Sequence, residues 1–179
     1  PILLPDLERL TTSRRPDFMV PPGTVLLSKG KPVTSSDTFP VIGELEYVTD
    51  GIKTGTDGTY VELGPDLQWV QIDLGAPATL AVITVWHFHS QARVYHDFII
   101  QVSDDPGFSR NVRTLYNNDE NDSAKLGKGA DPAYIETFQG RLIDAKGATG
   151  RYVRLYSNGN TSDELNHYCE VEVFGQPGK

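Results

Sequence analysis

One short stretch of the chain, HFHSQARVYHD at residues 87–97, gathers side chains that can bind ligands. Its imidazole, guanidinium and phenol groups form hydrogen bonds, and its rings offer flat apolar faces. A guanidinium can hold two oxygens of a hydroxyl pair, a carboxylate or a sulfate in one plane, so Arg93 is the strongest candidate for a ligand contact. The alternative for Arg93 is a surface ion pair with a neighbouring acidic loop. The candidates in this stretch are His87, His89, Arg93, Tyr95 and His96.

The same histidines could instead bind a transition metal. His87 and His89 alternate on one face of an expected strand, and with Asp97 or His96 they could coordinate zinc. A water molecule on such a metal would make the site a metal-dependent hydrolase. However, the sequence contains no Gly-x-Ser-x-Gly or His-Glu-x-x-His motif, and no paired catalytic carboxylates stand out in the expected strands. The hydrolase is therefore the weaker interpretation.

Alternating apolar and polar residues predict that strands position these side chains. Because no long helical pattern occurs, the sequence predicts an all-β protein, a β-sandwich of two antiparallel sheets. The last two expected strands, within Arg151–Gly175, form a hairpin around the loop NGNTSDELN, and both Trp69 and Trp86 are expected in the core. The expected strands are Val25–Ser36, WVQIDLG from Trp69, TLAVITVWHFH from Thr79, DFIIQVS from Asp97, NVRTLYN from Asn111, YIETFQ from Tyr134, GRLIDA from Gly140, RYVRLYS from Arg151 and HYCEVEVFG from His167.

The order of these strands places the long loops at one end of the sandwich. If WVQIDLG ends at the bottom and antiparallel strands alternate in direction, the short connections LGAPAT and SDDPGFSR fall at the bottom. The top then holds all four histidines, and Asn158, Asn160 and His167 could reach the site from the final loop. Loops on a rigid scaffold carry binding function more often than sheets do, so we expect the site at the top. The long loops lie at about residues 36–68, 88–96, 117–133 and 157–167.

Composition limits the possible partners. The 179-residue chain has a formal charge of -8 and a pI of about 4.9, which disfavours nucleic acid. No apolar run approaches the roughly 20 residues that span a bilayer, so we expect no membrane insertion. The single cysteine, Cys169, excludes an internal disulfide and is expected to be a buried, inert thiol. We predict a proline-rich arm or linker at residues 1–23 and one monomeric domain at residues 24–179.

Five landmarks, in order, resemble a known family. They are WVQIDLG, TVWHFH, FIIQVSDDPGFS, GRYVRLYSNGN and CEVEVFG. Over about Val25–Gly175 they resemble the discoidin or coagulation factor V/VIII type C domain, and within it the bacterial family 32 carbohydrate-binding modules. The resemblance implies a jelly-roll sandwich whose loops at one end take a ligand. Eukaryotic members usually tie the domain's ends with a disulfide, which a chain with one cysteine cannot form, so the bacterial branch is favoured.

The resemblance also implies a function. It points to a non-catalytic module that binds a polysaccharide or glycan end and is appended to a secreted carbohydrate-active enzyme. The setting would be bacterial, and either secreted, cell-surface or periplasmic. The ligand candidates named above would then contact sugar, neutral or anionic. The alternative is a discoidin-type adhesion module whose loops grip a protein or cell-surface partner.

Members of this branch commonly hold one structural calcium ion beneath the loops. The resemblance places it between the Asp-Gly turn and the start of the last strand, at Asp50 and Glu170. Calcium takes about six to eight oxygen ligands, and an ion could fix a loop rich in glycine and threonine. The alternative is that Asp50 only caps a turn and Glu170 faces solvent. Further ligands would be main-chain oxygens near Tyr47, Ile52, Gly55 and Cys169.

The acidic loop NNDENDSAKLGKGAD is a second possible cation site. Asp119, Asp122 or Asp131 could supply carboxylate oxygens. The loop lacks the ordered spacing of an EF-hand, which favours a solvated loop.

Overall fold

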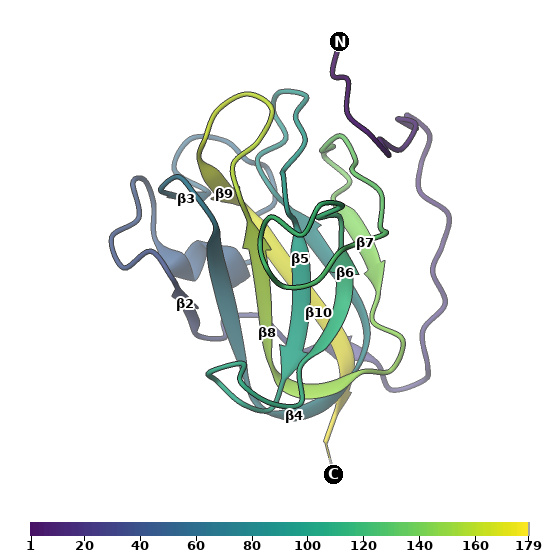
Figure 1. Cartoon of the computed structure of the whole chain (residues 1–179). Helices are drawn as coiled ribbons and strands as arrows, with labels where there is room; N and C mark the ends of the chain where they lie inside the picture. The colour runs from purple at the N-terminus through teal and green to yellow at the C-terminus, as the bar shows by residue number, and fades with distance from the viewer. Residues whose placement is uncertain (179) are drawn as a thin grey trace.

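The fold is built almost entirely from β-strands. A computed structural model describes residues 1–178 (Figure 1). Its helical element is a 3-10 turn, η1, at Leu45–Thr49, and no helix in the described residues is long and apolar enough to cross a membrane. The all-β prediction is confirmed. The strands are β1 (Val25–Leu26), β2 (Val33–Ser35), β3 (Val61–Leu63), β4 (Gln68–Trp86), β5 (Ile99–Ser103), β6 (Arg113–Asn117), β7 (Arg141–Asp144), β8 (Thr149–Ser157), β9 (Asn166–Tyr168) and β10 (Glu170–Pro177).

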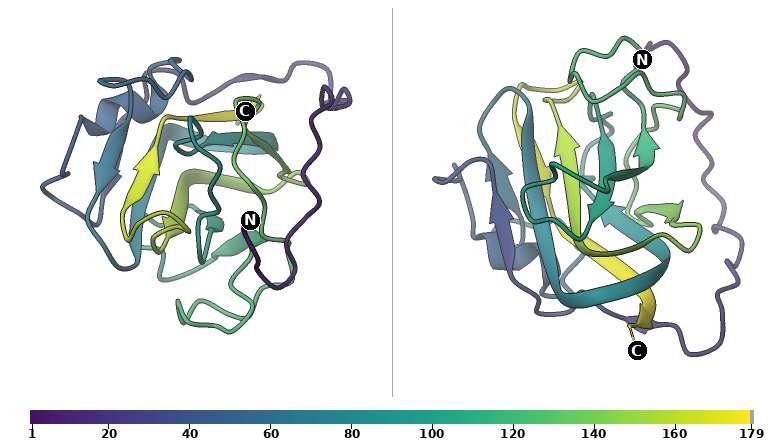
Figure 2. Two further views of the ribbon diagram at one scale, coloured as in Figure 1. Left: turned by 90° about the horizontal axis from the view of Figure 1, so that it is seen from above. Right: turned by 60° about the horizontal axis from the view of Figure 1, so that its bottom comes forward.

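One long strand, β4, connects the two layers of the sandwich. Its first part pairs with β2 and β8, and its second part pairs mainly with β10 and β7. A register shift between Asp73 and Ala78 separates the two parts, and the strand sweeps around the lower edge there (Figure 2, right). One layer runs β2-β4-β8-β5-β6 and the other β1-β10-β4-β7, with all strand pairs antiparallel. The predicted jelly-roll sandwich of antiparallel sheets is confirmed.

The predicted hairpin within Arg151–Gly175 does not form. β8 lies between β4 and β5, whereas β10 lies between β1 and the second part of β4, so the two strands belong to different layers. The run HYCEVEVFG also divides at Cys169, because β9 pairs with β3 and β10 pairs with β4. Alternation along a strand predicts an extended backbone, but it does not identify the partner strand.

Three further strand boundaries differ from the prediction. Val25–Ser36 contains two short strands that pair with different partners, and LGAPAT lies inside β4 instead of forming a turn. YIETFQ forms no strand, although Tyr134 and Glu136 are buried as its alternation predicts. The main-chain bond in this segment runs from Glu136 N–H to Arg93 O (2.9 Å), so the segment is extended without joining a sheet.

The core lies between the two layers and is formed by the inward-facing apolar residues of the strands. Neither tryptophan belongs to this cluster between the layers, because Trp69 and Trp86 alternate with inward-facing Val70 and Val85. Trp69 packs against the Arg154 guanidinium (4.0 Å), and Trp86 donates its ring N–H to Phe138 O (3.0 Å). Trp86 is buried, at 6% exposed, as expected of a core residue, whereas Trp69 is only partly buried and packs against the smaller cluster of Ile99, Ala124 and Tyr156. Core members include Val70, Ile72, Ile83, Val85, Ile100, Val102, Val153, Leu155, Val171 and Val173.

Three of the four long loops lie at one end of the sandwich, as the strand directions predict, whereas residues 36–68, which contain η1 and β3, lie along one side (Figure 1). The loops that follow β4, β6 and β8 lie at the top. The β5–β6 turn, the β7–β8 turn and the end of β10 lie at the bottom. All four histidines therefore belong to the top half.

Residues 1–23 form an extended arm along the outside of the sandwich, on the β7 side (Figure 2). Glu8 N–H donates to Ala133 O (2.8 Å), and the Arg15 guanidinium donates to Gln139 O (3.2 Å) and Gly140 O (3.0 Å). The arm thus lies on the domain. The boundary at residues 23 and 24 stays a prediction, and residue 179, the predicted end of the domain, lies outside the described residues.

Replacing Gly140 with alanine should destabilise the protein by about 2–4 kcal/mol. Gly140 has φ +70°, and an added Cβ would lie 2.5 Å from the Trp86 ring, so the variant adds a clash to backbone strain. Gly147→Ala is a matched control, because Gly147 has φ +72° with no atom within 4 Å of an added Cβ. Urea unfolding of both variants measures the difference. Equal losses of stability would contradict the role given to Trp86.

Candidate functional site

Two of the loops that form the top are joined by main-chain hydrogen bonds. His96 N–H donates to Gly159 O (3.0 Å), and Asn158 N–H donates to His96 O (2.9 Å). The Asn160 amide stabilises the second loop from within by donating to Leu165 O (2.9 Å). Loops 87–98 and 158–165 therefore hold each other in place.

A buried chain of side-chain hydrogen bonds supports these loops. The Tyr95 hydroxyl lies 2.7 Å from Nδ1 of His167, and Nε2 of His167 lies 2.9 Å from Oε1 of Glu62. Burial lowers the pKa of His167, and the bond to Glu62 opposes this shift in part. A neutral imidazole then donates from Nε2 to the carboxylate and accepts the Tyr95 proton at Nδ1. The chain links three elements: the loop after β4, β9 and β3.

Arg93 lies against the aromatic side of this network. Its guanidinium carbon is 4.5 Å from the centre of the Phe88 ring, its Nη2 donates to Gln91 Oε1 (3.2 Å), and its Nη1 lies 3.5 Å from Asp163 Oδ2. Burial alone would raise the pKa of Asp163, but hydrogen bonds from Leu165 N–H and the Asn160 amide, with the Arg93 charge, lower it. At 3.5 Å, the contact to Asp163 is longer than a typical N–H···O hydrogen bond.

Two of the predicted ligand residues are too deeply buried to touch a ligand directly. His87 has no exposed surface and Tyr95 is 2% exposed, because both rings stack on each other at 4.3 Å within the interior. Asn160 and His167 are also buried, in the loop scaffold and the hydrogen-bonded chain. His87 and Tyr95 support the site from beneath, and their prediction as direct contacts is corrected. Direct contact by Asn160 and His167, which are 7% and 4% exposed, stays a prediction. Arg93 is 5% exposed and lies beneath the exposed Gln91.

The remaining predicted residues lie on two different sides of the top. His96 and Asn158 line a cavity of 280 Å³ that also contains Asp97, Asp6 and Asn121. His89 lies on the other side, with Nε2 2.8 Å from Lys53 O. Arg93 with its neighbours is therefore one group, and His96 with Asn158 is another.

The zinc site, the weaker alternative for these histidines, does not form in this structure. His87 Nδ1 lies 2.8 Å from Glu136 Oε1 in the interior, whereas His89 bonds to a main-chain oxygen and His96 lies across the top. Within residues 1–178, no group of three His, Cys, Asp or Glu side chains is placed to hold a metal ion. The histidines therefore give no support to a zinc hydrolase.

The structure adds residues that the sequence interpretation missed. Phe88 and Tyr60 form an edge-to-face pair at 5.3 Å beside Arg93, and Gln91 and Asp163 bond to its guanidinium. The sequence did contain a signal for Phe88. In an extended backbone Phe88 faces the opposite side from His87 and His89, so it could have been considered as a separate contact. No local pattern brings Tyr60 or Asp163 to the same place.

The arrangement of strands and loops agrees with a match to a protein family. Residues 47–155, more than half of the chain, match the F5/8 type C model described as NedA-like, galactose-binding domain. The chain belongs to this family. This match confirms the family membership that the five sequence landmarks predicted. No curated protein sequence matches this F5/8 type C domain significantly.

Solved structures with the same fold include modules that bind carbohydrates. The family 32 carbohydrate-binding module of AlyQ, in complex with 4,5-unsaturated mannuronic acid, is 20% identical, with a TM-score of 0.57 over 80% of this chain and 93% of that one. A chitosan-binding module from Paenibacillus sp. IK-5 is 23% identical, with a TM-score of 0.54 over 84% and 99%. The F5/8 type C domain also matches 15% of the family 89 glycoside hydrolase of Clostridium perfringens, at 20% identity and a TM-score of 0.64 over 86% of this chain.

The candidate calcium residues of this F5/8 type C domain lie together beneath the loops. Glu170 begins β10 and is 2% exposed, and its Oε1 has no hydrogen-bond partner within residues 1–178. Burial, then the charge of Asp50, raise the pKa of Glu170 to about 8. Asp50 follows η1 and accepts Ile52 N–H at Oδ1 (2.9 Å). Asp50 thus does cap a turn, but Glu170 does not face solvent.

Three of the proposed main-chain ligands belong to residues that contact Asp50 or adjoin Glu170 in the sequence. Gly55 lies next to Cys169, since a Cβ added to Gly55 would be 3.3 Å from the Cys169 sulfur. Tyr47 O accepts Asp50 N–H (3.4 Å), and the Lys29 ammonium donates to Asp50 O. Cys169 itself is fully buried, and burial raises the pKa of its thiol to about 12, as expected of an inert cysteine. The buried, unpartnered Oε1 of Glu170 and the nearby Asp50 carboxylate are oxygen donors of the kind that calcium takes.

The acidic loop uses its carboxylates to fold itself. Asp119 accepts Ala124 N–H (2.8 Å) and Ser123 N–H (3.0 Å), and Asp131 accepts Asn117 N–H (2.8 Å). Asp122 likewise accepts Gly127 N–H (2.9 Å), and among the described residues no three acidic side chains of this loop are grouped to hold a metal ion. The loop therefore gives no support for a second cation site.

Lowering the pH from 7.5 to 5 should destabilise the protein by about 1 kcal/mol through His167. The pKa of His167 is lower in the folded state than the ordinary 6.5, so its contribution is complete above pH 6.5 and is lost as pH falls through the folded pKa. His167→Gln keeps a donor and an acceptor but does not titrate. Urea unfolding at several pH values should give a smaller acid loss for this variant, and equal losses would contradict the proposed tautomer.

Proposed function

We propose that this F5/8 type C domain is a non-catalytic carbohydrate-binding module that recognises a polysaccharide or glycan end through its top loops. The observation that carries the proposal is the Arg93 guanidinium, held 4.5 Å from the Phe88 ring next to polar Gln91 and Asp163. A planar donor beside an aromatic ring suits the hydroxyls and the apolar face of a sugar ring. The carbohydrate ligands of the AlyQ and chitosan-binding modules support the same class of ligand.

The frame beneath this site supplies its rigidity. The chain from Tyr95 through His167 to Glu62 and the bonds between the two loops fix the backbone that carries Arg93. Little order then has to be gained when a ligand binds, which limits the entropic cost of binding. A sugar hydroxyl pair or carboxylate would replace Asp163 on Nη1 of Arg93, and the Phe88 ring would pack against the ring carbons. His87 and Tyr95 act in this scheme by positioning Arg93.

A calcium ion would stabilise the same end of the domain. Asp50 and Glu170 would supply carboxylate oxygens, and main-chain oxygens near Tyr47, Ile52, Gly55 and Cys169 would complete the ligands. When bound, the ion would neutralise the buried Glu170 carboxylate and tie the loop after η1 to β10. The role is structural, so its readout is stability.

The setting follows from the same proposal. The relatives include a module next to an alginate lyase domain in AlyQ and a small part of a larger glycoside hydrolase chain. We infer that this domain is likewise appended to a secreted bacterial carbohydrate-active enzyme. The module would hold the enzyme near its substrate.

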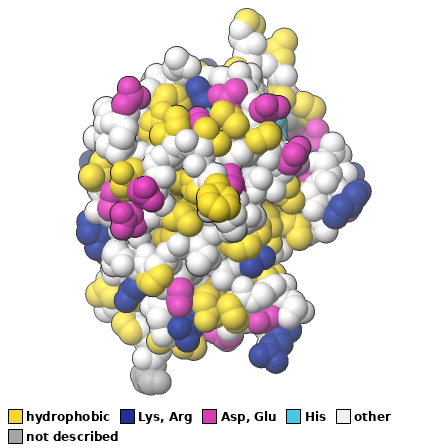
Figure 3. Space-filling view, turned by 90° about the vertical axis from the view of Figure 1, so that its left-hand side faces the viewer, with side chains coloured by type: hydrophobic (Ala, Val, Ile, Leu, Met, Phe, Trp, Pro, Cys, Tyr) yellow, Lys and Arg dark blue, Asp and Glu magenta, His cyan; other side chains and the backbone are white. Residues whose placement is uncertain are grey.

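The surface drawn in Figure 3 is relevant to the alternative function, adhesion to a protein partner. On the side where β2 and β3 lie, hydrophobic side chains are interspersed with acidic, basic and polar ones instead of forming one continuous apolar face. Continuous apolar patches mark protein interfaces, so this side does not favour a protein partner over a sugar.

Affinity electrophoresis tests the function. The protein should be retarded in gels that contain at least one neutral, uronic or sulfated polysaccharide, at both 20 and 500 mM salt if hydroxyls dominate recognition. A glycan array covers chain ends that soluble polymers lack. Absence of binding in both formats, with folding confirmed by circular dichroism, would overturn the proposal.

A further inference from the structure

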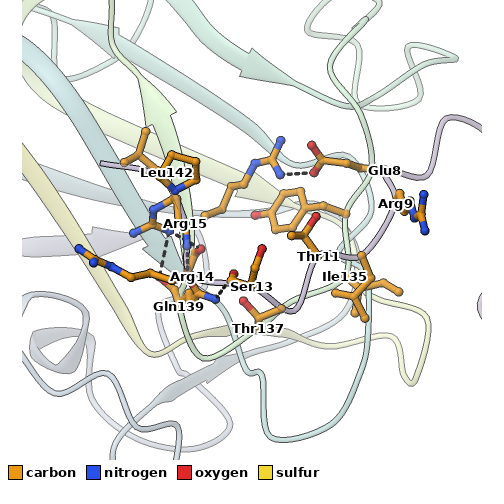
Figure 4. Close-up of a pocket in the computed structure, with 15 residues that line it drawn as sticks. Glu8, Arg9, Thr11, Ser13, Arg14, Arg15, Ile135, Thr137, Gln139 and Leu142 are labelled. Carbon is orange, nitrogen blue, oxygen red and sulfur yellow. Dashed lines mark hydrogen bonds and ion pairs between the residues drawn. The ribbon is translucent and has the colours of Figure 1, made fainter. Parts of the chain in front are cut away.

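A second pocket lies away from the top loops, between the N-terminal arm and β7 (Figure 4). Its volume is 480 Å³, within the range of about 300–1,000 Å³ that small-molecule sites occupy. Residues 8–16 form one wall and residues 134–142 the other. Four arginines line it, Arg9, Arg14, Arg15 and Arg141, against the single acidic residue Glu8. This basic pocket is unexpected on a chain with a net charge of -8.

Two of the four guanidinium charges have no carboxylate partner. Arg141 pairs with Glu8, and Arg14 pairs with Asp17 (2.9 Å). Within residues 1–178, neither Arg9 nor Arg15 forms an ion pair. Arg15 donates to two carbonyl oxygens, which orient the guanidinium but do not neutralise it. The pocket therefore has excess positive charge, of which the Arg15 guanidinium is held at a fixed position.

Reciprocal hydrogen bonds hold the two walls together. Arg15 N–H donates to Gln139 Oε1 (2.9 Å), and the Gln139 amide donates back to Ser13 O (3.1 Å). On the far side, the Arg141 guanidinium lies 4.6 Å from the centre of the Tyr134 ring. The pocket thus combines fixed planar donors with an aromatic ring and neutral polar groups.

We propose that this pocket binds the carboxylate or sulfate group of an acidic saccharide, as a second site separate from the top loops. Arg15 holds one anionic group, because a guanidinium forms bidentate, charge-assisted bonds to carboxylate or sulfate oxygens. Arg9 lies on the other side of the pocket (Figure 4), where its charge attracts a neighbouring anionic group of the same saccharide chain. Thr11, Thr137 and Gln139 lie on the walls, where their polar groups face the ring hydroxyls. The proposal rests on the carbohydrate-binding function for the class of ligand, but the charge of the pocket is independent of that function.

Isothermal titration calorimetry with tetragalacturonate, β-1,4-galactotetraose and sodium sulfate tests the proposal. The titrations use Arg93→Ala protein, so that failure of the top site does not hide the second site. We expect tetragalacturonate to bind and galactotetraose to bind at least tenfold more weakly. Binding should weaken at 1 M NaCl, where screening is strong. Equal binding of sulfate and tetragalacturonate at matched charge would overturn the saccharide assignment.

Two substitutions separate charge from scaffold. Arg9→Gln removes a charge that makes no contact with the wall, and it should weaken tetragalacturonate binding about tenfold, whereas Arg9→Lys should retain most of it. Gln139→Ala loosens the arm but keeps all four arginines, so it controls for arm displacement. Absence of tetragalacturonate binding to Arg93→Ala protein, or unchanged binding in Arg9→Gln, would overturn the second site. Neither outcome affects binding of neutral glycans at the top loops.

Discussion

Adding calcium at pH 8 to protein freed of metal should raise its melting temperature by about 5–10 °C. Ligand at about one hundred times its dissociation constant stabilises a folded protein by about 2.7 kcal/mol, and each kcal/mol is worth about 2–4 °C in a domain of this size. The gain comes from Glu170, whose carboxylate is buried with Oε1 unpartnered in residues 1–178. Differential scanning calorimetry before and after chelation measures it.

The increase in melting temperature caused by calcium should become larger as the pH rises. The pKa of Glu170 is about 8 in the folded state, against an ordinary value of 4.5. Without calcium, the stability contributed by the protonated carboxyl is complete below pH 4.5 and is lost as pH rises through 8. Calcium binds the ionised carboxylate and should restore the lost stability, with the largest effect above pH 8.

Two glutamates on β10 provide the matched pair for this experiment. Glu170→Gln should remove both the loss of stability at high pH and the gain from calcium. Glu172→Gln changes the same charge on the same strand, where Glu172 pairs with Lys53, and should keep the calcium response. A wild-type melting temperature that calcium does not change at pH 8 would contradict the calcium site.

Replacing Arg93 with alanine should weaken glycan binding by at least about 30-fold, which corresponds to about 2 kcal/mol. The loss includes the bonds of the guanidinium to the ligand and the unpaired Asp163 that the variant leaves behind. Arg93→Lys should recover only part of the affinity, because an ammonium cannot hold two oxygens in one plane. Titration calorimetry with the best glycan from the screen gives the affinities.

A second arginine serves as the control for Arg93. Arg151 also pairs with a carboxylate, Asp73 (2.8 Å), but it lies on β8 towards the bottom of the sandwich. Arg151→Ala should leave glycan affinity unchanged. If Arg93→Ala lowers the melting temperature and leaves affinity intact, Arg93 is only a structural ion pair, and the assignment of the site is wrong.

The all-β class, and the end of the sandwich at which most long loops lie, could be predicted because both depend on local sequence patterns. Alternation such as that of Val70, Ile72 and their neighbours marks one buried face, and strand direction then sorts the loops into two ends. The partner of each strand could not be predicted in this way. β8 and β10 follow one another in sequence, yet β4 lies between them because it bends from one layer into the other.

The candidate site could be predicted only as a region. Residue type indicates what a side chain can do, but exposure depends on partners that are distant in sequence. His87 is buried against Glu136, which is 49 residues away, and His167 against Glu62, which is 105 residues away. Asp163 was missed for the same reason, because it lies 70 residues from Arg93 in the sequence but contacts it in the fold.

The pairing of β10 sets the time at which the domain can fold during synthesis. β10 pairs with β1, near the start of the domain, and with the second part of β4. The hydrogen-bonding edges of β1 and β4 that pair with β10 therefore stay unpaired until residues 170–177 have left the ribosome exit tunnel. A nascent chain arrested before β10 should bind chaperones and be cut readily by protease, whereas one arrested well beyond it should resist.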